Sequence, residues 1–432
     1  MASTYLTRTF SLSNRRTFTI SYWTKRTEIS SGGGADFSAG APNAGAGFDV
    51  GFGSTDKFFI YDYNGATDYG YDTTAVFRDV NAWYHVVVSI DTTQATVSDR
   101  AKLYINGEQI TLNNTYDDFP LNFDTYVNTA ITHGINTNPF SSAFKDKLFA
   151  HFHFIDGTAY DADTFGETDS TTGIWKPKTA PSVTYGNNGF FLKFENSAAM
   201  GTDSSGNSNT FTVNGSMTQL IDTPSNVFAT WNRLDTNSNA TLSNGNTTFA
   251  TSSNNSYEPG KCTLGFSSGK YYVEHKLTST IGYALLMGIY KTNLNGQDQT
   301  SMDSGRYVYN CSNGSILSTS GGTLQSGLAT LTNGDILGIA VDCDNGTIDF
   351  YKNGSQVGTT VTNSEISSNE WTFGSQPRLS TTVSSNFGNG YFGTTAVSSA
   401  QNPDDGIGIF EYSVPTGYKA LCTKSINAQE YS

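Results

Sequence analysis

DILGIAVDCDNGTIDFYKNG, residues Asp335–Gly354, decides the fold class of this chain of 432 residues. Its first half alternates apolar side chains with smaller or polar ones, which is typical of a strand with one buried face. Asp344-Asn345-Gly346 follows, and Asn-Gly is the strongest short hairpin signal because both residues tolerate a positive φ. A second strand, Thr347–Lys352, ends at another Asn-Gly pair. The stretch therefore predicts an antiparallel hairpin.

The first half of the chain repeats this design. Tyr84–Asp91 reads as a strand, and Lys102–Gly107 reads as a second one that closes on Asn-Gly. Two such units in one chain predict two β domains of related design. Further short strands, separated by turn residues, are expected at Arg16–Trp23, Phe48–Phe52, Lys57–Tyr63, Lys145–Ile155, Gly189–Glu195, Lys270–Thr278, Ala284–Thr292, Tyr307–Cys311, Glu370–Phe373 and Thr382–Phe387.

The composition favours a folded, all-β chain with many turns. Charged residues make up only 14% of the chain and hydrophobic residues 36%, a balance that also occurs in disordered chains. Here the polar residues interleave with Tyr, Phe, Val and Ile at strand spacing, which favours sheets. No long helical period is present, so helix should be sparse.

The charge balance excludes some classes of partner. The net charge is −14, and phosphate backbones repel such a chain, so we expect no nucleic-acid partner. No apolar run approaches the roughly 20 residues that span a bilayer, so we expect no membrane insertion. The first residues lack the apolar run of a secretory signal, and we expect folding in a cytoplasm.

Four cysteines lie far apart in the second half, without metal-ligand spacing. We expect four free thiols, with two disulfide bridges as the alternative. The pattern of strands and turns divides the chain into a first sandwich (1–196), a bridge (197–226), a second sandwich (227–397) and a C-terminal tail (398–432) whose apolar residues should pack against the body or a partner. The fold class is all-β, with two antiparallel jelly-roll sandwiches in tandem.

Both sandwiches resemble known families. Trp83–Val88 and Lys102–Gly107 resemble the W-x-H-V and L-Y-I-N-G core of laminin G-like, concanavalin A-type domains. The second sandwich resembles a SPRY domain, and the two resemblances cover most of residues 1–395. The SPRY resemblance rests on the opening strand Lys270–Glu274, the central hairpin Gly334–Asp342 with Ile348–Gly354, and the closing Ser385–Gly388 with Phe392.

A narrower resemblance bears on function. A series of short motifs resembles the large virion structural proteins of bacteriophages, especially marine ones, which join a laminin G-like domain to a SPRY domain. The resemblance implies a tail fibre, a tail-associated adhesin or a capsid appendage. The motifs are Phe152–Gly157, Phe165–Glu167, Gly173–Pro177, Asp203–Asn207 and Val414–Thr423.

No catalytic constellation is evident in the sequence, so we expect no catalytic residues and no enzyme. A retaining glycosidase needs two carboxylates about 5–5.5 Å apart. The Glu-x-Asp-x-x-Glu signature of concanavalin A-type glycosidases is missing, and Glu167 with Asp169 comes nearest. The chain has only five histidines and no G-x-S-x-G, which leaves a serine triad with little support.

We expect no cofactor, and the metal content stays open. His151 and His153 should share one face and could bind zinc, but we favour a structural pair because no third ligand follows at regular spacing. Structural calcium is an alternative, because loop aspartates are calcium ligands, although turns also prefer them. The candidate segments are Asp203–Asn209, Asp161 with Asp163, and Asp342 with Asp344.

Aromatic residues offer a candidate binding surface. Tyr61, Tyr63, Tyr69 and Tyr71 alternate with the acidic residues Asp62, Asp68 and Asp72. Such a surface suits sugars, since aromatic faces cover C–H patches and carboxylates accept hydroxyl hydrogen bonds. Packing against a neighbouring subunit is the alternative that we favour at this stage.

The expected function follows from architecture and resemblance. We expect a non-enzymatic bacteriophage virion protein, assembled in the host cytoplasm and carried on the particle exterior, that binds a host surface glycan or protein. The alternatives are a capsid decoration protein without host binding and, less favoured, a polysaccharide-degrading enzyme. Other virion proteins are the expected partners, and a homo-oligomer is expected because virion parts are usually symmetric.

Overall fold

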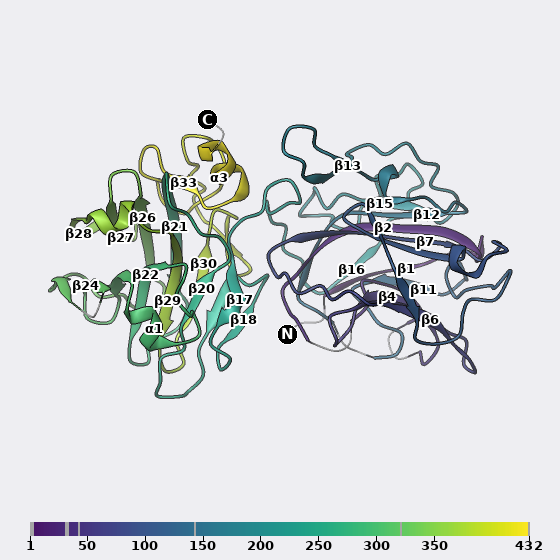
Figure 1. Cartoon of the computed structure of the whole chain (residues 1–432), viewed down its shortest axis with the longest axis horizontal. Coiled ribbons are helices and arrows are strands. Elements are labelled where there is room, and N and C mark those ends of the chain that lie inside the picture. Colours follow the sequence, from purple (N-terminus) through teal and green to yellow (C-terminus); the bar gives the residue numbers. More distant parts are fainter. Residues whose placement is uncertain (1–3, 31–33, 42–43, 142–143, 320–321, 431–432) are drawn as a thin grey trace. The chain divides into compact units, whose positions relative to one another are not determined.

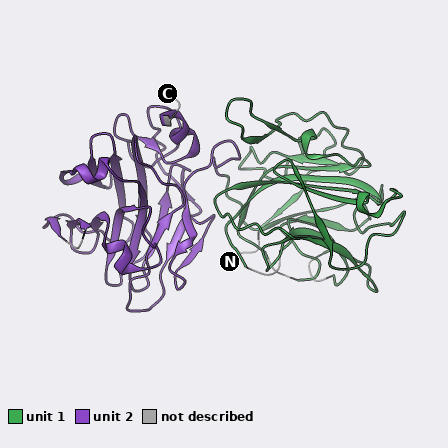
Figure 2. Cartoon of the chain, viewed as in Figure 1, with its two compact units in different colours: residues 1–219 green, residues 220–432 purple. Residues whose placement is uncertain are grey.

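A computed structural model describes residues 4–30, 34–41, 44–141, 144–319 and 322–430 of the chain (Figure 1). The chain forms two compact units, unit 1 at Met1–Gln219 and unit 2 at Leu220–Ser432 (Figure 2). Both are built almost wholly from antiparallel sheets, which confirms the all-β prediction. In the described part of the chain, no helix is long and apolar enough to cross a membrane.

Unit 1 contains two large sheets and a small one. The eight-stranded sheet runs in the order β10 (Leu112–Asn114), β6 (Asp68–Thr73), β5 (Phe58–Tyr63), β4 (Gly47–Phe52), β3 (Phe37–Ala39), β11 (Thr132–Ile135), β1 (Tyr5–Thr9) and β16 (Thr212–Asn214). The six-stranded sheet runs in the order β15 (Phe190–Leu192), β12 (Lys147–Asp156), β2 (Thr17–Arg26), β7 (Trp83–Asp91), β8 (Ala101–Ile105) and β9 (Glu108–Ile110). A two-stranded sheet joins β13 (Gly166–Thr168) to β14 (Trp175–Pro177), and 3-10 turns cover Val97–Asp99 and Ala162–Thr164.

The core of unit 1 lies between its two large sheets. Alternate residues of each strand face inward, as the period of two requires. Phe48 and Val50 of β4 meet Phe18 and Ile20 of β2 in one buried cluster. The rings of Phe18 and Phe48 lie 5.8 Å apart and nearly perpendicular, an arrangement that aromatic pairs prefer.

Unit 2 is a second sandwich. Its seven-stranded sheet runs in the order β17 (Trp231–Thr236), β20 (Gly260–Cys262), β29 (Trp371–Pro377), β22 (Leu285–Lys291), β23 (Arg306–Asn310), β24 (Ser315–Leu317) and β25 (Thr323–Gln325). The eight-stranded sheet runs in the order β18 (Thr241–Ser243), β19 (Thr248–Ala250), β30 (Thr382–Asn386), β21 (Lys270–Leu277), β26 (Ile336–Asp342), β27 (Thr347–Lys352) and β28 (Ser355–Thr362), with β33 (Lys419–Ala420) beside β21. A short ladder pairs β31 (Tyr391–Phe392) with β32 (Thr395–Ala396).

The hairpin predicted from Asp335–Gly354 is present as β26 and β27. Val341 lies opposite Ile348, and Gly346 occupies the turn with a φ of +65°. One expectation is wrong: β26 is buried at all seven positions, rather than on one face only. The reason is that the C-terminal tail covers the second face, where it packs on Ala340.

The tail completes the eight-stranded sheet of unit 2. β30 pairs with β21 from Glu274 to Leu277, and β33 pairs in parallel with the remainder of the same edge at Tyr271 and Tyr272. Glu274 holds the tail in place, because its buried carboxylate accepts hydrogen bonds from the backbone N–H groups of Glu411 (2.8 Å) and Tyr412 (2.9 Å). The apolar tail therefore packs against the body, one of the two alternatives expected from the sequence.

The segment expected to be a bridge is placed differently by the structure. β16 adds to the edge of the eight-stranded sheet of unit 1, where Val213 lies opposite Leu6. Phe211 is buried in the core of the same unit. Residues 197–219 are therefore part of the first sandwich, and the division between the units falls after Gln219. A turn-rich composition concealed this short closing strand.

Helix is sparse in the described residues, as predicted. The three α-helices are short and lie in unit 2: α1 (Gln299–Asp303), α2 (Ser364–Ser367) and α3 (Thr423–Glu430). The prediction of free thiols is confirmed, since all four cysteines are buried and unbridged: Cys262, Cys311, Cys343 and Cys422.

Candidate functional site

The tyrosines of the predicted aromatic surface divide between the two faces of the eight-stranded sheet in unit 1. Tyr61 and Tyr63 alternate with core residues of β5, so they lie on the outward face. Tyr69 and Tyr71, on the neighbouring β6, pack toward the core instead. The stretch therefore supplies two outward tyrosines rather than a cluster of four.

Two residues from distant segments complete an outward cluster of rings. Tyr116 lies 5.0 Å from Tyr61 between ring centroids, and Phe140 lies 5.2 Å from Tyr61 and 6.4 Å from Tyr63. Tyr116 exposes 48% of its surface. We call Tyr61, Tyr63, Tyr116 and Phe140 the aromatic patch. Its rings are close enough to form one surface on which a ligand could stack.

A carboxylate orients the central ring of the patch. The Tyr61 hydroxyl donates a hydrogen bond to Oδ1 of Asp68, on the facing strand β6. Burial and this hydrogen bond raise the pKa of Tyr61, so its hydroxyl keeps its proton at neutral pH. Asp68 thus fixes the Tyr61 ring and adds a negative charge to the edge of the patch.

A buried aspartate positions Phe140. Asp49 lies opposite Tyr61 in the sheet ladder and is only 2% exposed. Its Oδ2 accepts a hydrogen bond from the Asn138 side chain (3.0 Å), whose own Oδ1 accepts from the backbone N–H of Phe140 (2.7 Å). Burial and the nearby Asp62 raise the pKa of Asp49 well above its usual range. A chain of hydrogen bonds therefore runs from the sheet to the patch.

The sequence interpretation missed Asp49, Asn138, Tyr116 and Phe140. The last three come from loops, and single-sequence patterns do not reveal which loops meet on a sheet face. A usable signal was present only for Asp49, which is an acidic residue between Phe48 and Val50 in a strand flanked by glycines. The alternation of that strand predicts an outward carboxylate.

The histidine pair packs as a structural pair. His153 donates to or accepts from the Tyr185 hydroxyl at 2.9 Å and stacks on Phe191 at 3.9 Å, whereas His151 lies 5.9 Å from the same ring. The register of β12 shifts between Ala150 and His153. Throughout the described residues, no group of three His, Cys, Asp or Glu side chains is placed to hold a metal ion.

The loop aspartates considered for calcium hold turns together. Asp203 accepts four hydrogen bonds, from the backbone N–H groups of Phe191, Ser205 and Asn209 and from the Ser205 hydroxyl.

The aspartates of the other two candidate segments have similar contacts. Asp342 accepts hydrogen bonds from Asn345 and Lys270. Asp344 accepts from Gly269, and Asp161 accepts from Thr164. Asp163 lies with Asp161 at the 3-10 turn. Their donors are protein groups that stabilise the turns.

In one serine–histidine contact, the histidine is in a tautomer that cannot act as a base toward the serine hydroxyl. The Trp175 indole N–H donates to Nδ1 of His85 (3.0 Å), so the proton of neutral His85 sits on Nε2 and is donated to Ser21 Oγ (3.0 Å). His85 therefore cannot accept the Ser21 proton. Trp175 packs on the outer face of the six-stranded sheet with Val87.

A second serine–histidine contact is inaccessible. Ser385 Oγ lies 2.8 Å from Nδ1 of His275 and accepts the Trp231 indole N–H at 3.1 Å. All three side chains are at most 1% exposed. No substrate can contact this pair while unit 2 is folded.

The acidic pair nearest to a glycosidase signature is tied to a lysine. The Lys176 ammonium lies 2.9 Å from Asp169 and 3.6 Å from Glu167 across the β13–β14 ladder. The lysine pairs with both carboxylates, which leaves one net negative charge on the group, and it joins the two short strands. The contacts are those of an exposed structural ion-pair group.

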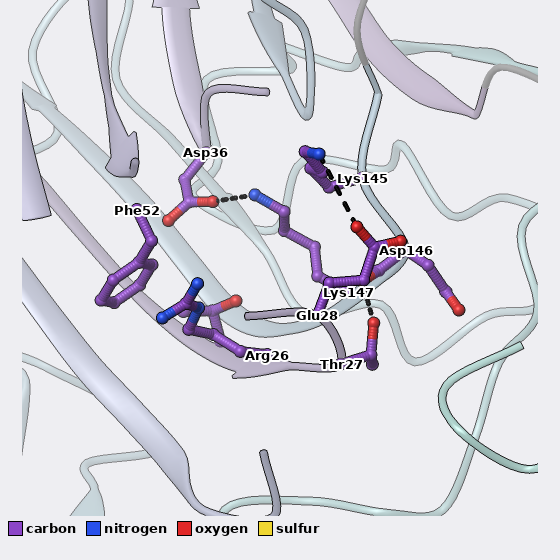
Figure 3. Close-up of a pocket in the computed structure, with 9 residues that line it drawn as sticks. Arg26, Thr27, Glu28, Asp36, Phe52, Lys145, Asp146 and Lys147 are labelled. Carbon is purple, nitrogen blue, oxygen red and sulfur yellow. Dashed lines mark hydrogen bonds and ion pairs between the residues drawn. The ribbon is translucent and has the colours of Figure 1, made fainter. Parts of the chain in front are cut away.

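A small cavity in unit 1 is lined by charged side chains that pair with one another. It has a volume of about 20 Å³, the space of one water molecule (Figure 3). Lys147 pairs with Asp36 on one side, and Lys145 lies 3.6 Å from Glu28 on the other. The cavity lacks the room that an organic ligand requires.

Unit 2 presents an exposed aromatic and cationic surface of its own. The Arg378 guanidinium lies over the Tyr283 ring at 4.1 Å and over the Tyr257 ring at 5.6 Å. Tyr283 is 61% exposed, and Nε of Arg378 has no hydrogen-bond partner. Leu379, next in the chain, has a φ of +55°, a conformation that is costly for a bulky residue.

Comparisons with known proteins agree with this architecture. Residues 2–146 match the model of the concanavalin A-like lectin/glucanases superfamily, and residues 252–369 match that of the SPRY domain. The chain carries a concanavalin A-like domain and a SPRY domain. The aromatic patch lies on the concanavalin A-like domain, and the Arg378 surface lies on the SPRY unit. No curated protein matches the chain.

Solved structures similar to the SPRY unit include three distant ones. The SPRY domain of human HERC1 is 16% identical, covers 36% of this chain and 96% of its own, and has a TM-score of 0.31. The TRIM65 PSpry domain is 12% identical over 36% of this chain and 88% of its own, with a TM-score of 0.30. Stonustoxin is 16% identical over 37% of this chain and 27% of its own, with a TM-score of 0.30. These likenesses carry no information about function.

Proposed function

We propose that the chain is a non-catalytic, glycan-binding protein on the exterior of a bacteriophage particle. The observation that carries the binding function is the aromatic patch on the outward face of the eight-stranded sheet in unit 1. A cluster of rings with a carboxylate at its edge matches the chemistry of a sugar, which has apolar C–H faces and a rim of hydroxyl donors. Tyr61 would stack on the ring of the sugar, and Asp68 would accept its hydroxyl groups.

The virion context rests on the motif series that resembles phage structural proteins. It supports a tail fibre, a tail-associated adhesin or another appendage of the particle, with a capsid decoration protein lacking host binding as the alternative. A polysaccharide-degrading enzyme has less support, because a retaining glycosidase needs a pair of carboxylates and the nearest candidate pair, Glu167 and Asp169, is bound to Lys176. Antibody-gold labelling of intact particles separates these readings. Label on the tail favours host recognition, regular label on the head favours decoration, and unlabelled particles would contradict the virion proposal.

Replacement of Tyr61 by alanine is expected to abolish most glycan binding. Tyr61 contacts two other rings of the patch, and loss of one stacking surface costs about 1.4 kcal/mol or more, which is a tenfold or larger loss of affinity. The measurement is binding of the purified full chain to an oligosaccharide array, followed by calorimetry with the strongest binder. Tyr283→Ala, which removes an exposed tyrosine from unit 2 and leaves the aromatic patch intact, is the control.

The same variant tests whether the aromatic patch packs against a second copy of the chain. We propose a homo-oligomer, a trimer or higher, and its mass in solution can be measured by light scattering. If Tyr61→Ala dissociates the oligomer and leaves glycan binding unchanged, the patch is a subunit contact. A wild-type chain that stays monomeric at micromolar concentration would contradict the oligomer proposal.

A protein-binding role for unit 2 is a second candidate function. The observation that favours it is the exposed Tyr283 ring stacked on Arg378, because tyrosine and arginine dominate binding hot spots. Arg378→Ala is expected to weaken capture of isolated virion or host surface proteins by tenfold or more. Tyr61→Ala serves as the control. Equal capture by both variants would contradict this assignment.

A further inference from the structure

Acidic residues border the aromatic patch. Asp68 borders Tyr61 through their hydrogen bond. Asp117, which is exposed, follows Tyr116 in the chain and donates its backbone N–H to the backbone carbonyl of Asp68 at 3.2 Å. Two acidic residues therefore lie next to the patch, and its four members carry no cation.

Asp68 differs from its neighbour Asp72 in the group that it binds. Asp72 lies four residues further along β6, on the same outward face, and forms an ion pair with Lys57 at 3.1 Å. Among the described residues, no lysine or arginine forms an ion pair with Asp68. Its bonded partner is the neutral Tyr61 hydroxyl, which leaves its charge uncompensated and its Oδ2 open to hydroxyl donors.

We infer that the aromatic patch selects uncharged glycans and rejects saccharides that carry a carboxylate or a phosphate. A hydroxyl-bearing ring can stack on Tyr61 and donate to Asp68. An acidic sugar in the same position brings a second negative charge within a few ångströms of Asp68. Like charges in contact discriminate between ligands as effectively as attractive contacts do. The inference rests on the proposed glycan-binding function of this same patch and specifies its ligand class.

The test uses matched pairs of oligosaccharides, each with and without a terminal sialic or uronic acid, titrated into the full chain by calorimetry. At 0.15 M salt the acidic member of each pair is expected to bind roughly three- to tenfold more weakly. This difference in affinity within a pair should shrink as salt is raised to about 0.5 M, because screening weakens repulsion between exposed charges. A steric cause would leave the difference unchanged and would overturn the electrostatic inference.

Asp68→Asn is the decisive variant. The asparagine oxygen still accepts the Tyr61 hydroxyl, so ring orientation is retained while the charge is removed. The ratio of the affinity for the neutral saccharide to that for the acidic one is expected to fall by threefold or more. Asp72→Asn makes the same change in net charge about 13 Å away along the strand and should leave the ratio unchanged. Melting temperatures of both variants verify that unit 1 stays folded.

Failure of the inference and failure of the proposed function give different results. If acidic saccharides bind as tightly as neutral ones and Tyr61→Ala removes both, glycan binding stands and the selectivity is overturned. If no saccharide binds, or if Tyr61→Ala changes nothing, the proposed function falls and the selectivity falls with it.

Discussion

Unit 1 is expected to lose about 2 kcal/mol of its free energy of unfolding between pH 6.5 and 4.5, whereas unit 2 should change little. The cause in unit 1 is its buried histidines. Burial lowers the pKa of His85 and His133 to about 3 and that of His153 well below 6.5. These rings stay neutral in the folded unit but take up protons below pH 6.5 when it unfolds. Their stabilisation is therefore full above pH 6.5 and is lost as the pH falls.

Two carboxyl groups of unit 1 act in the opposite direction. Burial raises the pKa of Asp62 to about 7 and that of Asp49 well above its usual range. Near pH 5.5 Asp62 is therefore protonated in the folded unit and ionised in the unfolded chain, and the raised pKa of Asp49 acts in the same direction. Unfolding therefore takes up protons on the histidines, with His151 adding to the other three, and releases protons from the two carboxyl groups. A net uptake of one proton is worth about 1.4 kcal/mol per pH unit and is reached only as the pH falls below the ordinary histidine pKa.

In unit 2, proton uptake by a histidine and proton release by a glutamate cancel on unfolding. The pKa of His275 is lowered to about 3 by burial, and that of Glu274 is raised to about 7 by burial. One proton is bound and one is released on unfolding in this pH range, so the net slope is close to zero. Hydrogen exchange followed by mass spectrometry at pH 7, 5.5 and 4.5, corrected for intrinsic exchange rates, measures both units in one chain.

Asp62→Asn provides the internal control for the acid prediction. The amide oxygen can still accept the backbone N–H of Tyr126, but the asparagine side chain has no proton to release on unfolding. The slope for unit 1 should steepen by about 1.4 kcal/mol per pH unit. Equal acid sensitivity of the two units would contradict the assignment to His85, His133 and His153, and a slope that Asp62→Asn leaves unchanged would contradict the compensating role of Asp62.

Replacement of Glu274 by alanine is expected to destabilise unit 2 by about 3 kcal/mol and to release its tail. The variant removes the acceptor of the backbone N–H groups of two half-buried residues, Glu411 and Tyr412. Each unsatisfied group costs about 1–3 kcal/mol. Faster hydrogen exchange and proteolysis confined to residues 398–422 are the expected readouts.

Glu258→Ala is the matched control for this prediction. Glu258 is also a buried glutamate of unit 2 that accepts a backbone N–H, from Ser252, but it contacts a loop far along the chain from the tail. Its loss should destabilise unit 2 without exposing residues 398–422 selectively. Glu274→Gln, which keeps one acceptor oxygen, should fall between wild type and Glu274→Ala.

The sequence predicted what depends on local pattern. Alternation and Asn-Gly turns were sufficient for the β26–β27 hairpin and for the long strands β2, β7 and β12. The three-residue strand β16 was not recognised, because only its pairing with the distant β1 makes it a strand. Short strands have little pattern of their own, so tertiary pairing decides them.

The candidate site was predicted only in part, for the same reason. Tyr61 and Asp68 belong to one hairpin, and their alternation places them on the outward face. Phe140 reaches them from a loop 79 positions later in the sequence than Tyr61, through Asn138 and the buried Asp49. A contact of that kind follows from the closed sheet, which a single sequence does not reveal.

The closing strands of the two units also set the order of events during synthesis. Unit 1 begins with β1, whose partner β16 is translated about 200 residues later, so its sheet stays open until residue 214 has emerged from the ribosome. Unit 2 likewise waits for β33 before the edge of β21 is complete. Domains usually fold in the order of their synthesis. Unit 1 can therefore close its sheet and bury Phe211 before most of unit 2 has been translated, and each unit folds without needing strands of the other.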